Sequence, residues 1–243
     1  MKSSLFLQVF RRTNAGEDIV DIHRRYISYW QGKGGPFGLP EGFQDSDPMF
    51  REGELVAVHF LNTPKDDLRL SFDYKFRSDK FLRNEAFYDD SLIVKLKFGS
   101  VQYRTLLRDW LPQMAKSFGA YRVQVLPLDY VMAYTDSGWN EWADRPSSNP
   151  GYHRLREAPG VDVDGRNNIF TLHPGMFWDS ELCKRALGYG PAEVERRIKN
   201  EAPLVELTEN GIHLVLNENA DMCFDEYVDM NEYFGRLLEI DRG

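Results

Sequence analysis

Residues 68–76 read LRLSFDYKF, a stretch in which apolar and polar side chains alternate without interruption. A period of two places the side chains of Leu70, Phe72 and Tyr74 on one face of a β-strand and the intervening polar side chains on the other. A strand of this kind packs one face on a core and exposes the other to water, as strands of antiparallel sheets commonly do. The stretch therefore predicts an antiparallel strand.

Other segments repeat the strand pattern. Alternation or short apolar runs predict strands over residues 5–10, 56–60, 92–98, 205–207 and 212–216. The alternating segments between residues 56 and 98 predict a meander, and Asn210-Gly211 predicts a hairpin turn between the last two strands. Residues 121–134 are also rich in strand formers, but Pro127 has no amide hydrogen and favours an edge or interrupted strand.

Helices are predicted where apolar residues recur every three or four positions. These segments begin near residues 18, 101, 180, 192 and 224. Pro112 should kink or split the second of them. Strands and helices come in clusters rather than in strict alternation, which indicates an α+β fold with a mainly antiparallel sheet and packed helices. We expect one domain over residues 1–243, with two lobes divided near residues 140–165, where a long stretch is rich in Gly, Pro, Ser and Asn.

Composition narrows the class of protein. The chain has 243 residues, 42% of them hydrophobic, and a net charge of −8. No run approaches the roughly 18 apolar residues of a membrane helix, and the first apolar run, residues 5–10, is too short for a signal-peptide core. We therefore expect a soluble, cytoplasmic protein with no membrane partner. The acidic balance argues against direct binding to nucleic acid.

Motifs for catalysis, cofactors and metals are missing from the sequence. It has no glycine-rich dinucleotide or phosphate loop, no HExxH and no GxSxG, so we expect neither an enzyme nor a cofactor. Cys183 and Cys223 lack the CxxC spacing of zinc ligands and are expected to be free thiols. The histidines stand far apart, at no metal-ligand spacing, and are expected to be structural or exposed rather than metal ligands: His23, His59, His153, His173 and His213.

One fragment supports an enzymatic alternative. Asp73 and Lys75 lie two residues apart on the alternating strand, as the carboxylate and lysine of restriction-type nucleases do, with Glu54 or Asp66 as a second acid. Such a carboxylate would hold a divalent metal, and the lysine would steady the attacking water or the phosphate. The same two residues also occupy the polar positions that any amphipathic strand would fill, so the nuclease or hydrolase remains the alternative.

Two other acidic pairs could be interpreted as metal sites, but each has a simpler structural explanation. Asp89-Asp90 precedes a strand and is explained as a turn between two elements. Residues 162–165 read DVDG and resemble the start of a calcium loop, but Arg166 follows at the fifth position and His173 stands at the twelfth, where glutamate is required. We expect an ordinary loop there.

The features that favour a protein partner are an acidic C-terminus and two tryptophans. Residues 218–243 carry eight acidic residues against two arginines, which accounts for most of the net charge. We predict that a partner-binding surface is formed by the acidic residues of the last helix together with a tryptophan-bearing loop: Trp139, Trp142, Asp225, Glu226, Asp229 and Glu232.

Three segments resemble the bacterial immunity protein 52 family of polymorphic and type VI toxin systems. They are residues 35–39 (GPFGL), residues 137–142 (SGWNEW) and residues 211–215 (GIHLV) leading into the last helix. The resemblance implies an α+β protein, usually encoded beside a toxin of the restriction-endonuclease-like class, that acts by tight association and has no active site. It implies a cognate toxin as the partner. A non-catalytic adaptor of a secretion or phage-related system is a further alternative.

Overall fold

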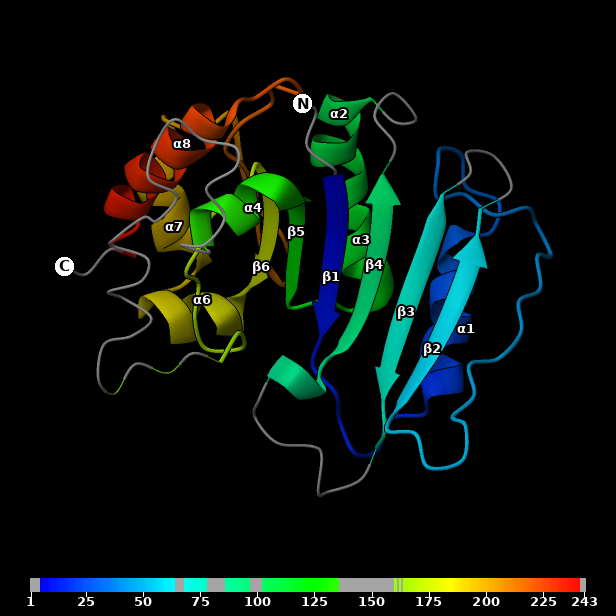
Figure 1. Cartoon of the computed structure of the whole chain (residues 1–243). Helices are drawn as coiled ribbons and strands as arrows, with labels where there is room; N and C mark the ends of the chain where they lie inside the picture. Colours follow the sequence, from blue (N-terminus) through cyan, green and yellow to red (C-terminus); the bar gives the residue numbers. More distant parts are fainter. Residues whose placement is uncertain are drawn as a thin grey trace.

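The computed structural model describes residues 5–63, 68–77, 86–96, 102–135, 160, 162 and 164–240. Its centre is one eight-stranded sheet in the order β2-β3-β4-β1-β5-β6-β8-β7, and every ladder between these strands is antiparallel (Figure 1). The strands are β1 (Leu5–Arg11), β2 (Val56–Asn62), β3 (Arg69–Lys75), β4 (Asp90–Leu96), β5 (Arg122–Pro127), β6 (Gly175–Asp179), β7 (Leu204–Leu207) and β8 (Gly211–Val215). The predicted α+β class is confirmed.

The meander predicted around residues 68–76 is the β2-β3-β4 end of the sheet. Buried and less buried residues alternate along β3, as the sequence predicts. Of the two alternatives predicted from Pro127, the edge position is wrong, because β5 lies inside the sheet between β1 and β6. The interrupted strand is confirmed, because β5 ends at Pro127 and a helix begins at Leu128. Pro127 is tolerated there because it is the last residue of β5 and the chain continues directly into a helix.

Helices cover the sheet differently at its two ends. The helical elements are α1 (Ile19–Trp30), η1 (Ala86–Tyr88), α2 (Tyr103–Thr105), η2 (Leu106–Trp110), α3 (Leu111–Phe118), α4 (Leu128–Thr135), α6 (Ser180–Leu187), α7 (Pro191–Ile198) and α8 (Phe224–Leu237). Figure 1 shows α1 and α3 behind the sheet, and α4, α6, α7 and α8 grouped at the β6 end. None of the helices in the described ranges is long and apolar enough to span a membrane.

Two hydrophobic cores lie on opposite faces of this one sheet. On β6, Phe177 packs in the core beneath α1 and α3, whereas Met176 and Trp178 pack in the core beneath α6, α7 and α8. Both faces of β6 and β8 are therefore buried, while β3 buries one face more deeply than the other. The segment predicted to divide two lobes, residues 140–165, lies mostly outside the described residues.

The helix predicted around Pro112 is continuous but not regular. Residues 103–118 stay helical, and η2, a π-helical turn, directly precedes α3, in whose first turn Pro112 lies. Proline cannot donate to the carbonyl four residues earlier and collides with it in a regular helix. The wider π turn directly before α3 accommodates the proline within an unbroken run of helical residues, which is divided into α2, η2 and α3.

The long connection between α1 and β2 is held against the core by aromatic contacts. The Phe37 ring lies 5.7 Å from Trp30 and 6.0 Å from Trp110, measured between ring centroids. Gly35 has a φ of +84°, and a Cβ there would lie 2.1 Å from the Trp110 ring, so only glycine fits. With its first half anchored in this way, the connection returns along α1 and brings Asp45 beside that helix.

Candidate functional site

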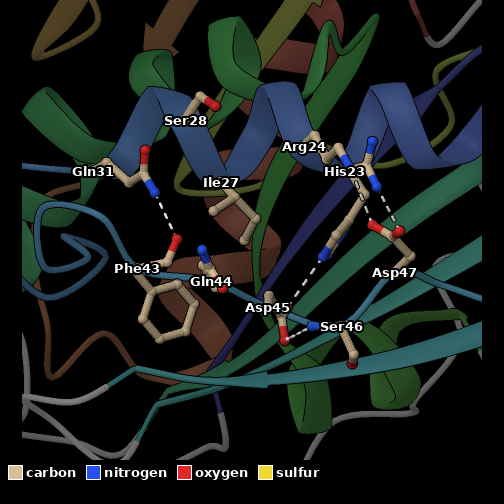
Figure 2. A pocket seen from close by; sticks show the side chains of 10 residues that line it. All are labelled: His23, Arg24, Ile27, Ser28, Gln31, Phe43, Gln44, Asp45, Ser46 and Asp47. Carbon is tan, nitrogen blue, oxygen red and sulfur yellow. Dashed lines mark hydrogen bonds and ion pairs between the residues drawn. The ribbon is translucent and has the colours of Figure 1, made fainter.

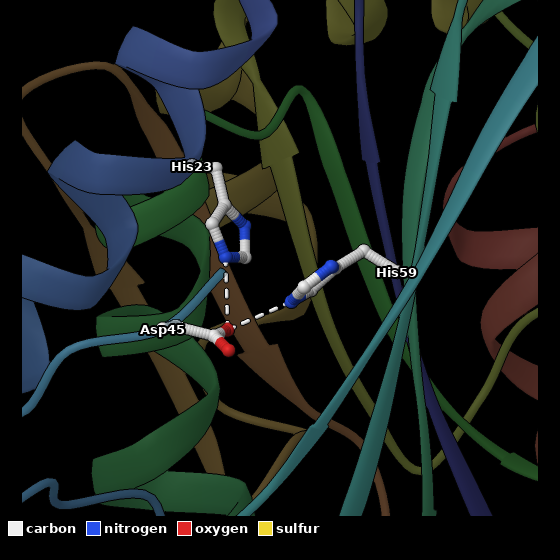
Figure 3. A group of neighbouring side chains, drawn as sticks. All are labelled: His23, Asp45 and His59. Atoms are coloured by element: carbon white, nitrogen blue, oxygen red, sulfur yellow. Dashed lines mark hydrogen bonds and ion pairs between the residues drawn. The ribbon is translucent and has the colours of Figure 1, made fainter. Parts of the chain in front are cut away.

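Three segments of the chain meet at a cluster formed by His23, Asp45 and His59 (Figure 3). His23 lies on α1, Asp45 in the connection that follows, and His59 on the edge strand β2. The Nε2 atoms of His23 and His59 lie 3.1 Å and 2.8 Å from the same oxygen, Oδ2 of Asp45. The side chains of His23, Asp45 and His59 are only 2%, 15% and 10% exposed.

Two residues of β3 contact His23, one at its second ring nitrogen and one against the ring edge-on. Its Nδ1 atom lies 2.9 Å from the hydroxyl of Tyr74, which is itself completely buried. The Phe72 ring packs edge-on against His23, with ring centroids 5.0 Å apart, and contacts His59 at 6.3 Å. Phe72 is also the residue opposite His59 in the β2–β3 ladder. The cluster therefore has a polar support and an apolar wall, both set by the register of β3.

The hydrogen bonds determine where the proton of His23 lies. A carboxylate only accepts hydrogen bonds, so Nε2 of His23 donates to Asp45, and Nδ1 of the neutral ring accepts from the Tyr74 hydroxyl. Burial lowers the pKa of His23 below its ordinary value, although the Asp45 carboxylate opposes that shift. For Asp45, burial raises the pKa, but hydrogen bonds from His59 and His23 outweigh it and leave the pKa below its ordinary value. A neutral His23 beside an ionised Asp45 is thus favoured.

A cavity of about 550 Å³ adjoins the cluster (Figure 2). His23 and Asp45 contribute to its wall, along with polar residues of α1 and of the connection. Arg24 and Asp47 form a bidentate ion pair in this wall, with N–O distances of 3.1 Å and 2.6 Å. A small ion or polar molecule can therefore approach Asp45 from this cavity.

The cluster was missed in the sequence because the three residues are 22 and 14 positions apart along the chain. Spacing rules for metal ligands describe residues on one helix or one turn, and this cluster draws on three separate elements. Among the described histidines, His173 and His213 are buried and have the structural role expected of them: His213 contacts the Leu107 carbonyl at 2.8 Å. His153 lies outside the described residues.

The predicted acidic surface of the last helix is present on α8. Asp225, Glu226, Asp229 and Glu232 are all exposed. Positions 225, 229 and 232 follow the spacing of one helical face, whereas Tyr227, Met230 and Phe234 pack in the core. Glu226 also has a local role, because its carboxylate accepts a hydrogen bond of 2.7 Å from the backbone N–H of Cys223 at the helix N-cap. The other half of the predicted surface, Trp139 and Trp142, lies outside the described residues.

Asp73 and Lys75 lie on the less buried face of β3, as the amphipathic pattern predicts. Of the two acids proposed to complete a nuclease site, Glu54 lies beside Arg51, 4.0 Å away, and Asp66 is outside the described residues. Within the described part of the chain, the group of metal-ligand side chains that the structure gathers is the histidine cluster, and Asp73 is not in it. Burial raises the pKa of Asp73, partly opposed by Lys75.

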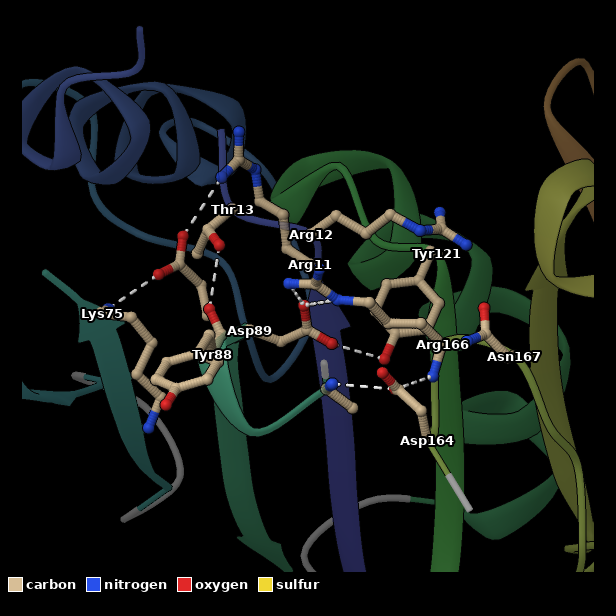
Figure 4. A network of polar contacts seen from close by, with 12 residues as sticks. Arg11, Arg12, Thr13, Lys75, Tyr88, Asp89, Tyr121, Asp164, Arg166 and Asn167 are labelled. Carbon is tan, nitrogen blue, oxygen red and sulfur yellow. Dashed lines mark hydrogen bonds and ion pairs between the residues drawn. The ribbon is translucent and has the colours of Figure 1, made fainter. Parts of the chain in front are cut away.

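The acidic pair Asp89-Asp90 is buried among arginines (Figure 4). Asp90 accepts from Arg11 and Arg77, and Asp89 accepts from Arg166 and from the Tyr121 hydroxyl. These cations neutralise the carboxylates and tie the ends of β1, β3, β4 and β5 together. The pair is therefore structural.

The carboxylates of Asp162 and Asp164 are used in local hydrogen bonds. The carboxylate of Asp164 accepts from the backbone N–H groups of Ala86 and Arg166, each at 2.8 Å. Asp162 accepts from the backbone of Asp164 at the same distance and from the Asn167 side chain at 2.7 Å. These contacts are those of a carboxylate-stabilised turn.

Comparisons with known proteins identify a shared fold. No protein-family model matches the sequence, and no curated protein matches it. Among solved structures, this chain is similar to the Pseudomonas aeruginosa T6SS protein PA0821, with a TM-score of 0.51 and 11% sequence identity. The alignment covers 98% of this chain and 76% of the PA0821 chain. The two chains therefore have similar folds over nearly the whole of this protein.

Proposed function

We propose that the protein is an immunity protein of a type VI or polymorphic toxin system, which binds a cognate nuclease effector and neutralises it in a stoichiometric complex. The observation that carries this proposal is the shared fold, since a protein named as a T6SS component aligns with 98% of the chain. The three sequence segments similar to the immunity protein 52 family point to the same kind of system. In this proposal the protein acts by association, catalyses no reaction, and meets the toxin in the cytoplasm.

The exposed acidic face of α8 is suited to binding a positively charged partner. Its four carboxylates, Asp225, Glu226, Asp229 and Glu232, lie on the solvent side of a helix whose other side is anchored in the core. A nuclease must present positive charge to its nucleic-acid substrate. A dense row of carboxylates on a rigid helix would attract that surface and speed encounter.

The experiment that tests the proposal co-expresses the chain with the toxin encoded beside its own gene and measures growth and binding. We expect the wild-type chain to restore growth and to form a one-to-one complex. Replacing the four carboxylates of α8 by neutral amides should slow association about 10-fold or more at low salt, with less effect at high salt. The changes are Asp225→Asn, Glu226→Gln, Asp229→Asn and Glu232→Gln.

A matched control removes the same number of charges at the other end of the molecule. The control changes are made at exposed acidic residues of α1 and of the connection after it: Asp21→Asn, Glu41→Gln, Glu52→Gln and Glu54→Gln. We expect these replacements to leave the association rate close to that of the wild type. Equal slowing by both sets would contradict a docking role for α8. Replacing Trp139 and Trp142 by alanine tests the second predicted anchor in the same assay.

Two outcomes would overturn the immunity function itself. A stable complex with secretion components, without protection against the toxin, would favour the adaptor. Metal-dependent cleavage of nucleic acid by the chain alone, lost in Asp73→Ala, would favour the nuclease.

A further inference from the structure

We propose that His23, Asp45 and His59 form a binding site for a divalent transition-metal ion of the zinc class, with an open coordination position toward the adjoining cavity. The ligand atoms of these three residues all lie within 4.8 Å of one another. This site is separate from the acidic face of α8, and its occupancy can be measured without any toxin.

The donor set is one that zinc uses. Two imidazole nitrogens and a carboxylate oxygen are zinc ligands, and three protein ligands with a fourth position open is a common arrangement. Ligand atoms about 2.0–2.1 Å from a tetrahedral ion lie roughly 3.4 Å from one another. The Nε2 atoms of His23 and His59 are already 3.1 Å and 2.8 Å from the Asp45 oxygen, so small side-chain shifts would admit the ion.

The protonation of the cluster is compatible with binding. A metal needs neutral imidazoles and an ionised carboxylate. Each Nε2 atom that now donates to Asp45 would instead bind the ion, with the ring proton moved to Nδ1. On His23 that proton would then be donated to the hydroxyl of Tyr74, 2.9 Å away. In the new arrangement the Asp45 carboxylate binds the ion and the relocated His23 proton keeps Tyr74 as its acceptor.

The surroundings resemble those of functional metal sites. A ligating histidine usually donates its second nitrogen to a fixed acceptor, which sets the ring orientation, and Tyr74 is placed to do so. The Phe72 ring supplies an apolar wall against both histidines. The cavity lined by His23 and Asp45 supplies an entry path and space for a water molecule as the fourth ligand.

A metal-free hydrogen-bonded cluster is the alternative that the experiment must exclude. The untagged, EDTA-treated protein is titrated with Zn²⁺ by calorimetry in a Cys223→Ser background, because Cys223 is an exposed thiol that could bind zinc. We expect one zinc ion per chain and a higher unfolding temperature with zinc. Asp45→Asn and His59→Gln should each weaken binding roughly 100-fold or more, and Tyr74→Phe about 10- to 100-fold.

The matched control is Glu209→Gln, which removes an exposed carboxylate from the turn between β7 and β8, outside the cluster; it should bind zinc as the parent does. Circular dichroism and urea unfolding without zinc establish that each variant is folded. X-ray absorption of the zinc-loaded parent provides a test that needs no variant, with two imidazole ligands expected. Absence of saturable binding, unchanged affinity in the folded Asp45→Asn and His59→Gln variants, or fewer than two imidazoles on the bound ion would overturn the proposal.

Discussion

Arg11 and Asp90 are paired residues of the β1–β4 ladder, and their side chains form a buried ion pair with an N–O distance of 3.1 Å. The Asp90 side chain is fully buried and that of Arg11 is 8% exposed. Removing one partner from such a pair leaves an uncompensated charge in the interior. The pair lies where the meander joins the rest of the sheet, so its loss should affect the whole fold.

The first prediction concerns this pair. Asp90→Asn should lower the free energy of unfolding by about 3–5 kcal/mol, because Arg77 loses this buried counter-charge and Arg11 is left with Glu17 as its partner. Asp47→Asn removes the partner of Arg24 in an exposed pair and should cost less than about 1 kcal/mol. Urea unfolding at neutral pH measures both. Similar losses in the two variants would contradict the structural role of Asp90.

The second prediction concerns acid sensitivity. Burial, with a smaller effect of the Arg122 charge, lowers the pKa of His173 to about 3. Below pH 6.5, His173 is therefore protonated in the unfolded chain, whereas in the folded chain it stays neutral until about pH 3. The free energy of unfolding consequently falls as the pH falls. His173 should account for a loss of roughly 2 kcal/mol between pH 6.5 and 5.

Urea unfolding of the wild-type chain and of His173→Gln over that pH range measures this loss. The variant is expected to be less stable at pH 7.5, because Gln fits a buried imidazole site poorly, yet to lose less stability on acidification. Parallel pH profiles for the two proteins would rule out His173 as the group responsible.

The third prediction separates stability from binding on α8. Glu226→Ala should cost about 1 kcal/mol, because it removes the acceptor for the Cys223 N–H at the helix N-cap. Glu232→Ala, an exposed change later in α8, should alter stability by less than about 0.5 kcal/mol. Thermal or urea unfolding measures both, and equal effects would show that the cap contributes little. Binding tests at position 226 should therefore use Gln, which can still accept the bond.

The fourth prediction contrasts two glycines. A Cβ at Gly211 would lie 2.1 Å from the Trp178 backbone oxygen, so Gly211→Ala should destabilise the protein by about 1–3 kcal/mol by forcing β6 and β8 apart. Gly235 lies inside α8, with nothing within 4 Å of its added Cβ. Gly235→Ala should stabilise the helix by about 0.5–1 kcal/mol. Unfolding midpoints that move in the same direction would contradict this contrast.

Much of the secondary structure could be predicted from periodicity. The alternation in residues 68–76 identified β3, and the Asn210-Gly211 pair identified the β7–β8 hairpin. These signals are local, because a half-buried strand or a tight turn imposes its pattern on adjacent residues. The sheet order depends on contacts between distant segments of the chain. β5 lies in the interior of the sheet despite Pro127, which is its last residue and is paired with Leu5 of β1.

The acidic face of α8 could also be predicted, because the charges and their helical spacing follow directly from the order of the residues. The sequence by itself therefore determined the α+β class, the amphipathic strands and an acidic last helix. Only the tertiary structure decided that His23, Asp45 and His59 meet, because no one element holds all three. They come together because the aromatic anchor at Phe37 returns the connection to α1, and the register of β2 on β3 places His59 opposite Phe72. Long-range packing, which has no local pattern in the chain, creates that site.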